Sequence, residues 1–244
     1  MKKHKIWIVG IGPGDSKRMT EQAKMVLSQS DVIVGYTVYI KLLAQEYAGK
    51  EFLTTPMTKE TERCRMCFEE AKKGRKTAFV CSGDPGVYGM AALMYELLPQ
   101  YPDCELEVVP GITAALSGGA ILGAPLNHDF CVISLSDRLT PWEKIEKRLK
   151  AAALGDFAIA IYNPSSRLRP DYLQRACEIL LEQIEGIRPC GYVENIGREG
   201  TRAAVCTLEE LKDREVNMFT TVFIGNSQTI LQGDKLIAKR GYHV

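Results

Sequence analysis

Three glycine-rich loops carry the residues whose types and spacing could do chemistry. They are GIGPGD (residues 10–15), SGDPGVYG (82–89) and PGITAA (110–115), and each follows an apolar run typical of a buried strand. The loops offer backbone donors and acceptors but contain no Lys or Arg. They therefore suit a ligand with a flat ring, a sugar and a short amino-acid tail better than one with phosphates.

The first loop departs from the fingerprint of dinucleotide-binding proteins. Gly14 follows Gly12 by two residues where the fingerprint needs three, and Pro13 lacks an amide N–H. No acidic residue follows the second apolar run, which ends in Tyr36-Thr37. Pyrophosphate binding is therefore disfavoured, and for this loop taken by itself a plain strand–helix turn is an equal alternative.

Strand-like and helical segments alternate through the first half of the chain and must position these loops. We expect strands at 5–10, 31–35, 51–55, 77–84 and 104–111, with helices at 19–30, 37–49, 58–74 and 86–101. This alternation predicts a parallel sheet with helices on both faces. Because function then lies at the carboxyl ends of the strands, the three loops should meet at one edge and form a cleft.

The second half has a different pattern. APLNHDF breaks the alternation, so we place a boundary near residues 115–128 and domains at 1–118 and 119–244. Strands are expected at 131–136, 157–163, 190–197, 201–208 and 219–226, two of them adjacent without a long helix, which predicts a mixed sheet. The predicted fold is α/β, with two α/β domains and the active-site cleft between them.

Composition excludes several classes of protein. The 31 basic and 30 acidic residues nearly cancel, which argues against nucleic acid or a membrane surface as a partner. No apolar run approaches the roughly 18 residues of a membrane span, and a signal peptide is not expected, so we predict a cytoplasmic protein. The Cys64–Cys67 pair shares a helical face with apolar residues, so buried core thiols are favoured and no metal is predicted.

Four ordered motifs, GIGPGD, SGDPGVYG, PGITAALSG and YVENIGREG, resemble the tetrapyrrole (corrin and porphyrin) methyltransferase family over nearly the whole chain. VGYTVYI, GDPGVYGMAAL and the segment from NHDFCVISLSDRLTPW to NPSSRLRP resemble its precorrin-3B C17-methyltransferase branch. The resemblance implies methyl transfer to C17 of a cobalamin precursor, precorrin-3B or cobalt-factor III, with ring contraction to the precorrin-4 level. Extra domains found in some members are not expected here.

The resemblance also implies a cofactor, S-adenosylmethionine, folded between the two domains of a homodimer. Its predicted contacts are Pro13, Gly83, Asp84, Val87, Thr113, Ala114, Asn163, Gly191 and Thr221. The family often has methionine where Asn163 stands, so that contact could come from the backbone.

Methyl transfer from a sulfonium needs alignment and exclusion of water more than a protein nucleophile. The electron-rich macrocycle can supply the attacking carbon, which agrees with the lack of a catalytic triad. Ring contraction adds proton movement, for which Asp84 and Tyr88 are the first candidates and Asp129 and His128 the next. His128 could equally be a linker residue whose ring is hydrogen-bonded and takes no part in the chemistry.

Residues of the second domain are candidates for binding the acetate and propionate groups of such a substrate. Arginine suits bidentate contacts with carboxylates, although each of these arginines could also be a solvated loop charge. The predicted substrate-binding residues are Asp129, Ser136, Arg138, Arg167 and Arg169, with Arg198 and Arg202 in second place.

Other functions stay open at this point. One is another methyltransferase of the same fold, acting on a different corrin intermediate, a modified protein histidine or ribosomal RNA; the neutral charge argues against RNA. A second, from another class, is a non-catalytic module that binds S-adenosylmethionine or a tetrapyrrole. The sequence leaves open whether the macrocycle carries cobalt, which residue drives ring contraction, and whether a partner or cluster is needed.

Overall fold

The computed structural model describes residues 3–242, and the chain divides into two units, one ending at Thr113 and the other beginning at Ala114. The predicted division at 118/119 falls inside helix α5 (Ala114–Leu122). This helix belongs to the second unit because it packs against the sheet of that unit.

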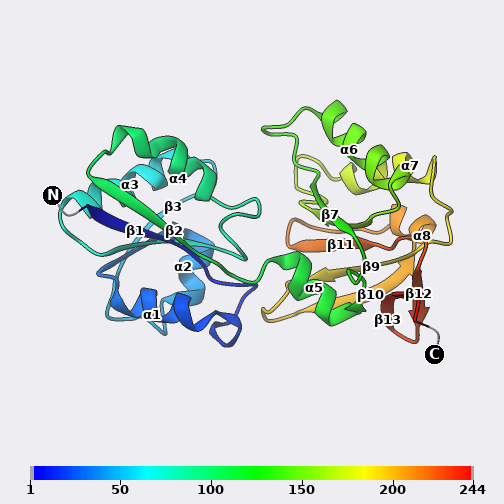
Figure 1. The fold of residues 1–244 in the computed structure, drawn as a ribbon, viewed down its shortest axis with the longest axis horizontal. Helices are drawn as coiled ribbons and strands as arrows, with labels where there is room; N and C mark the ends of the chain where they lie inside the picture. The colour runs from blue at the N-terminus through cyan, green and yellow to red at the C-terminus, as the bar shows by residue number, and fades with distance from the viewer. Residues whose placement is uncertain (1–2, 243–244) are drawn as a thin grey trace. The chain divides into compact units, whose positions relative to one another are not determined.

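The first unit is built on a five-stranded sheet in the order β3-β2-β4-β1-β5, and all neighbouring pairs are parallel. Figure 1 shows α3 and α4 on one side of this sheet and α1 and α2 on the other. The parallel sheet predicted from the alternating pattern is therefore confirmed. The strands are β1 (His4–Gly10), β2 (Val32–Tyr36), β3 (Glu51–Thr55), β4 (Thr77–Cys81) and β5 (Cys104–Val109).

Helices cover both faces of this sheet. Alternate residues of a strand point to opposite sides, and here both sides carry apolar side chains that pack under helices. Ile6 and Ile8 join the core under α3 and α4, whereas Val9 joins the core under α1 and α2. Thr20 caps α1 by accepting a hydrogen bond from the backbone N–H of Ala23 at 3.1 Å. The helices are α1 (Glu21–Gln29), α2 (Thr37–Leu43), α3 (Glu60–Lys72) and α4 (Ala91–Leu97), with short 3₁₀ turns η1 (Ser16–Arg18) and η2 (Leu98–Gln100).

Two of these helices are shorter than the sequence pattern predicts. α4 begins only at Ala91, because Tyr88 has a left-handed backbone (φ +51°) and ends any helix that could start at Gly86. α2 ends at Leu43, and the chain up to Gly49 forms turns.

The cysteines of α3 lie in the core. Cys64 and Cys67 are fully buried against the sheet, and burial raises the pKa of the Cys64 thiol to about 12. Among residues 3–242 no three His, Cys, Asp or Glu side chains gather as they would around a metal ion. The two thiols are core residues, as the helical pattern indicated.

The second unit has its own five-stranded sheet in the order β10-β9-β11-β8-β7. Only β7 and β8 run parallel; the other neighbours are antiparallel, so the predicted mixed sheet is confirmed. The strands are β7 (Phe130–Ser134), β8 (Ala158–Tyr162), β9 (Pro189–Glu194), β10 (Arg202–Thr207) and β11 (Thr220–Ile224).

Both faces of this sheet are also covered. One face carries the larger core, with α6 (Trp142–Leu154), α7 (Tyr172–Leu181) and α8 (Leu208–Lys212). α5 packs on the other face at close range, since a Cβ on Gly118 would lie 2.8 Å from the Phe223 ring. Glycine at this helical position permits the short distance between helix and sheet.

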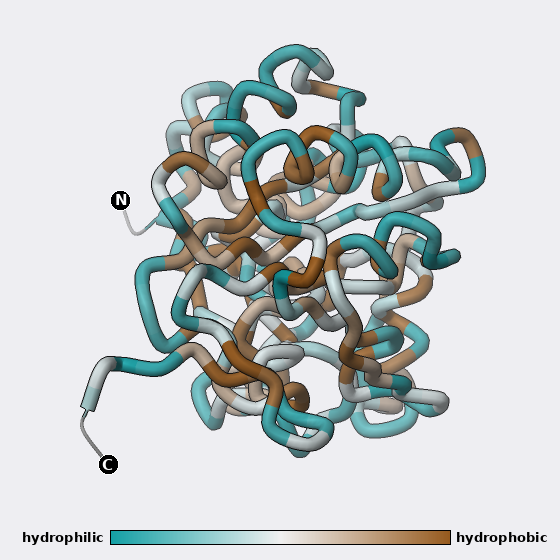
Figure 2. Tube along the Cα trace, turned by 90° about the vertical axis from the view of Figure 1, so that its right-hand side faces the viewer, coloured by the Kyte–Doolittle hydropathy of each residue, from teal (hydrophilic) through white to brown (hydrophobic). Residues whose placement is uncertain are grey.

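A third, three-stranded sheet was not predicted. It consists of β12 (Thr229–Gln232), β13 (Lys235–Ala238) and β6 (Gly123–Ala124). Strands of two to four residues are too short to show a periodic pattern. Figure 2 shows hydrophobic segments running through the interior and hydrophilic segments on the outer loops. Within the described part of the chain, no helix is long and apolar enough to cross a membrane.

Candidate active site

The three glycine-rich loops meet at the carboxyl edge of the first sheet, because β4, β1 and β5 are neighbours in it. The first two loops are joined by a pair of backbone hydrogen bonds. The N–H of Gly12 donates to the carbonyl of Gly83 at 3.1 Å, and the N–H of Gly83 donates to the carbonyl of Gly12 at 2.8 Å. The convergence expected from the strand order is therefore present in the first unit.

Glycines make this convergence possible. A Cβ on Gly111 would lie 2.1 Å from the carbonyl oxygen of Gly83, and one on Gly10 would lie 2.6 Å from the amide nitrogen of Gly111. No side chain fits at such distances from backbone atoms, which cannot move aside as a flexible side chain does. The three loops are thus packed backbone against backbone.

Asp84 holds the second and third loops together. One carboxylate oxygen accepts the N–H of Gly86 at 2.8 Å, and the other accepts the N–H of Gly111 at 3.0 Å. Asp84 was predicted to move protons and to contact the cofactor. Both of its oxygens already accept backbone donors, which favours a positioning role over proton transfer.

The other predicted residues of these loops differ in exposure. Tyr88 is 55% exposed on its left-handed backbone, Val87 and Thr113 are half-buried, and Pro13 is buried. Tyr88 is the more accessible of the two residues proposed for proton movement. Ala114, predicted with Thr113, is half-buried at the start of α5 in the second unit.

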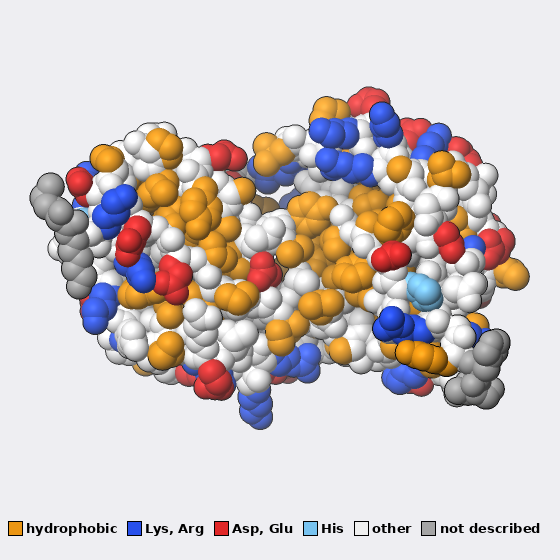
Figure 3. All heavy atoms as spheres, viewed as in Figure 1, with side chains coloured by type: hydrophobic (Ala, Val, Ile, Leu, Met, Phe, Trp, Pro, Cys, Tyr) orange, Lys and Arg blue, Asp and Glu red, His pale blue; other side chains and the backbone are white. Residues whose placement is uncertain are grey.

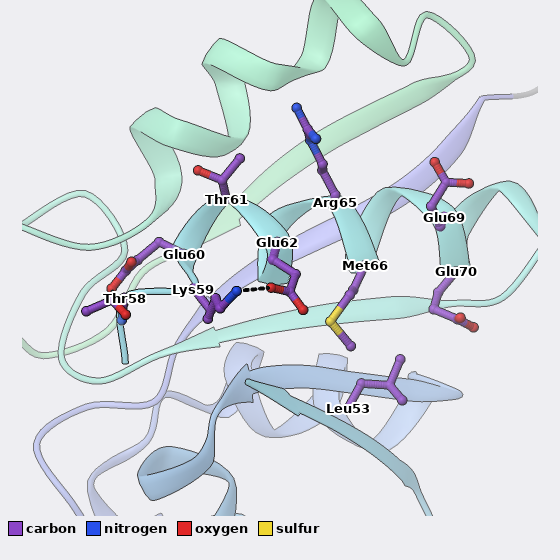
Figure 4. A pocket seen from close by; sticks show the side chains of 10 residues that line it. All are labelled: Leu53, Thr58, Lys59, Glu60, Thr61, Glu62, Arg65, Met66, Glu69 and Glu70. Atoms are coloured by element: carbon purple, nitrogen blue, oxygen red, sulfur yellow. Dashed lines mark hydrogen bonds and ion pairs between the residues drawn. The ribbon is translucent and has the colours of Figure 1, made fainter. Parts of the chain in front are cut away.

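A groove of about 750 Å³ beside α3 is not this site. None of its lining residues comes from the three loops. Three of its four glutamates are paired with cations: Glu62 with Lys59 at 3.2 Å (Figure 4), Glu69 with Lys72 at 3.6 Å and Glu70 with Lys73 at 2.7 Å. Most of the negative charge that lines the groove is therefore neutralised by neighbouring lysines.

In the second unit, the loops after β7 and β8 are joined at their bases. The side-chain amide of Asn163 donates to Ser134 Oγ at 2.9 Å, and the N–H of Ser136 donates to the same oxygen at 3.2 Å. Asn163 has a left-handed backbone (φ +53°), which Asn tolerates better than Met does. This explains how Asn fits where the family often has methionine.

Gly191 and Thr221 lie in the interior of β9 and β11, and both are buried. A Cβ on Gly191 would lie 3.0 Å from a methyl carbon of Leu122 in α5. Packing of α5 on the sheet therefore accounts for this glycine, and a cofactor contact at Gly191 stays a prediction.

A cluster around Asp137 is the main feature that sequence reasoning missed. The Asp137 carboxylate forms an ion pair with Nε of Arg169 and accepts a hydrogen bond from the Tyr172 hydroxyl at 2.6 Å. Tyr172 packs on Trp142 with ring centroids 4.5 Å apart, and the Arg175 guanidinium lies 4.0 Å from the Trp142 ring. Arg169, predicted to bind substrate, is thus bound to Asp137. The sequence does contain a signal for this ion pair, because an Asp follows one predicted strand and arginines follow the next.

This cluster predicts a pH-dependent stability. The hydrogen bond from Tyr172 and the Arg169 cation lower the pKa of Asp137. A carboxyl group whose pKa is lower in the folded than in the unfolded protein stabilises the fold at pH values above its unfolded pKa, roughly 3.9. This stabilisation is lost as the pH falls through the pKa of the folded state. We expect Asp137→Asn to lower the free energy of unfolding by about 1 kcal/mol at pH 7 and by much less near pH 2.

Urea unfolding at both pH values measures this difference, with the exposed Asp213→Asn as the matched control. An equal loss at both pH values would show that the ionised carboxylate is not what stabilises the loops.

The remaining candidates lie at the surface. The ring of His128 is hydrogen-bonded to the carbonyl of Lys239 at 2.7 Å, which ties it to the segment after β13 and favours a structural role over proton movement. Asp129, Arg138 and Arg167 are exposed. The second-tier residues are Arg198, whose guanidinium lies 5.4 Å from the Phe219 ring, and Arg202, which is exposed.

The two-unit fold and the glycine loops are matched by a known family. Residues 5–212 match the tetrapyrrole (corrin/porphyrin) methylases, and the chain belongs to this family. The prediction of a tetrapyrrole methyltransferase is thus confirmed.

Three relatives define its place within the family. The chain is 42% identical to the probable cobalt-factor III C(17)-methyltransferase of Salmonella typhimurium, over 96% of this chain and 98% of that protein. It is 41% identical to the cobalt-factor III methyltransferase of Priestia megaterium, where 98% of this chain spans only 45% of the relative. The crystal structure of the methyltransferase CobJ superposes with a TM-score of 0.89 at 37% identity, covering 96% of this chain and 99% of that one.

Proposed function

We propose that this protein transfers a methyl group from S-adenosylmethionine to C17 of cobalt-factor III or precorrin-3B, with ring contraction to the precorrin-4 level, in cobalamin biosynthesis. The observation that carries the proposal is the relationship, over nearly the full length of both chains, to a relative named as a C(17)-methyltransferase. Since both curated relatives described above are named for cobalt-factor III, the cobalt-containing ring is the first substrate to test.

The three glycine loops fit S-adenosylmethionine. The loops are built largely from glycine and small residues, so the ribose, adenine and amino-acid portions of this molecule can lie close to the backbone. They contain no cation for a phosphate. We assign Pro13, Gly83, Val87 and Thr113 to the contacts in the first unit. The second-unit contacts of the same proposal are Ala114, Asn163, Gly191 and Thr221.

The chemistry requires positioning above all. When bound, S-adenosylmethionine supplies a methyl group on a positively charged sulfur, and the electron-rich ring carbon supplies the electron pair of the new bond. The bond between the methyl carbon and sulfur breaks, its electron pair stays on sulfur, and S-adenosylhomocysteine is the second product. The protein contributes alignment, which can be worth about 7–11 kcal/mol, and keeps water out. Asp84 acts by accepting the N–H groups of Gly86 and Gly111, which fixes the second loop against the third.

Proton movement during ring contraction needs a group that can reach the macrocycle. Tyr88 is exposed at the edge of the second loop and is the better candidate, because Asp84 is occupied by two backbone amides. We further propose that the protein is a homodimer and acts in the cytoplasm.

The test of this function compares acceptors of different classes. The protein is incubated with methyl-labelled S-adenosylmethionine and, in separate reactions, cobalt-factor III, precorrin-3B, other corrin intermediates, ribosomal RNA and protein extract. We expect label in the first or second acceptor only. Label in another corrin intermediate alone would assign a different ring position, and label in RNA or protein would refute the proposal. Binding without turnover on any tetrapyrrole would favour the non-catalytic module.

A further inference from the structure

Two neighbouring loops of the second unit end in the same pair of residue types. The loop after β7 carries Arg138-Leu139, and the loop after β8 carries Arg167-Leu168. The leucines are 98% and 86% exposed, and both arginines are exposed. Because β7 and β8 are adjacent and parallel, both loops leave the same edge of the sheet. We call these four residues the Arg–Leu tips.

The two loops are held together at two levels. Ser134 and Asn163 join them at the base, where each loop leaves its strand. Further along, Asp137 in the first loop binds Arg169 and Tyr172 beyond the second tip. A short backbone turn, with the N–H of Arg169 donating to the carbonyl of Ser166 at 2.9 Å, shapes the second tip. The tips are therefore presented as one unit.

The α6 side of the second unit carries more basic than acidic side chains, with Glu143 and Glu146 among its four lysines and arginines. Lys and Arg side chains gather over the α6 side of the second unit (Figure 3). Lys144, Lys147 and Arg148 of α6 are exposed, and α6 follows the first tip directly. Such a surface attracts a polyanion.

We propose that the Arg–Leu tips form a clamp for a flat macrocycle whose rim carries carboxylates, with the arginines binding rim carboxylates and the leucines covering the ring. Asp137 is a positioning residue that sets the spacing of the two tips through Arg169 and Tyr172. The proposal rests on the proposed function for its ligand class. Arg138 and Arg167 then bind the substrate, whereas Arg169 holds the two loops together through Asp137.

This ligand accounts for both residue types at the tips. An apolar partner would explain the leucines but leave the arginines unused, whereas a nucleic acid would explain the arginines but gain little from aliphatic leucines. A polycarboxylate macrocycle presents an apolar face and an anionic rim together. Arginine binds carboxylates bidentately, so paired tips can also select the spacing of rim groups.

Uroporphyrin, a flat polycarboxylate tetrapyrrole, is the probe for the test. The chain has two tryptophans, so a Trp7→Phe background leaves Trp142, close to the tips, as the fluorescent reporter that the bound porphyrin quenches. In this background we expect Arg138→Gln and Arg167→Gln each to weaken uroporphyrin binding about tenfold and to reduce its salt dependence. Leu139→Ser and Leu168→Ser should each weaken it about threefold.

The positioning role of Asp137 is tested in the same assay. Asp137→Asn should weaken uroporphyrin binding severalfold while leaving the affinity for S-adenosylmethionine, measured by calorimetry, unchanged. A general folding defect would lower both affinities. The exposed Arg214→Gln, beyond α8, is the matched control for loss of one arginine and should bind uroporphyrin as the parent does.

Unchanged uroporphyrin affinity in both arginine variants, or no uroporphyrin binding by the parent protein, would overturn the clamp. A change of sedimentation behaviour in the tip variants without a change of affinity would also overturn it, since the tips would then contact a second copy of the chain. Failure of the proposed function is a separate result: it is the absence of methyl transfer to any tetrapyrrole by the unmodified protein.

Discussion

Gly111→Ala should abolish binding of S-adenosylmethionine and destabilise the first unit by about 3 kcal/mol or more. The added Cβ would lie 2.1 Å from the carbonyl oxygen of Gly83 and 2.8 Å from the Cα of Gly10. These neighbours are backbone atoms of the other two loops, so relief requires the loops to separate. Calorimetric titration with S-adenosylmethionine and thermal unfolding measure the two effects.

Gly49→Ala is the matched control for this substitution. A Cβ at Gly49 would meet no atom within 4 Å, so the same chemical change should leave both binding and stability nearly unaltered. Normal cofactor binding by Gly111→Ala would contradict the assignment of the three-loop surface as the cofactor site.

Asp84→Asn should weaken S-adenosylmethionine binding about 30-fold, an effect of roughly 2 kcal/mol. The asparagine amide keeps one acceptor oxygen and turns an NH₂ group towards a backbone N–H, so either Gly86 or Gly111 loses its partner. Asp84→Ala removes both acceptors and should be at least as damaging. Asp103→Asn, an exposed position of the same unit, is the control.

The Asp84 variants also separate positioning from proton transfer. A positioning residue changes the affinity for S-adenosylmethionine and leaves the pH dependence of turnover in place. If Asp84→Asn instead binds S-adenosylmethionine normally and loses turnover together with one limb of the pH profile, then Asp84 transfers protons and is not a positioning residue. Tyr88→Phe, measured alongside, is expected to retain binding and lose turnover.

The fold of the first unit could be predicted well because its sequence repeats one pattern, an apolar strand followed by a loop and a helix. Buried β-branched runs such as residues 5–10 and 31–35 end in glycine or polar residues, and parallel topology then brings their ends together. The meeting of the three loops followed from this order. The need for glycine at position 111 could not be predicted in this way. The atom that a Cβ would meet belongs to Gly83, which is close to Gly111 in space but not in sequence.

The roles of single charged residues were less predictable. Asp84 and Gly111 lie 27 residues apart, and nothing in either local sequence indicates that one accepts a hydrogen bond from the other. Arg169 lies in an arginine-rich loop, as a substrate-binding residue could, but Asp137 binds it. The small sheet of β6, β12 and β13 was missed since its strands are too short to show alternation.

The ring carbon that receives the methyl group decides whether this protein is a C17-methyltransferase. Cobalt-factor III and precorrin-3B are each incubated with the protein and S-adenosylmethionine carrying a ¹³C methyl group, with Gly111→Ala as the inactive control. Mass spectrometry and carbon NMR then follow the product. We predict one added methyl group, attached to C17 of a contracted ring, from at least one of the two substrates. A labelled methyl group on any other ring carbon, or methylation confined to a different corrinoid, would contradict it.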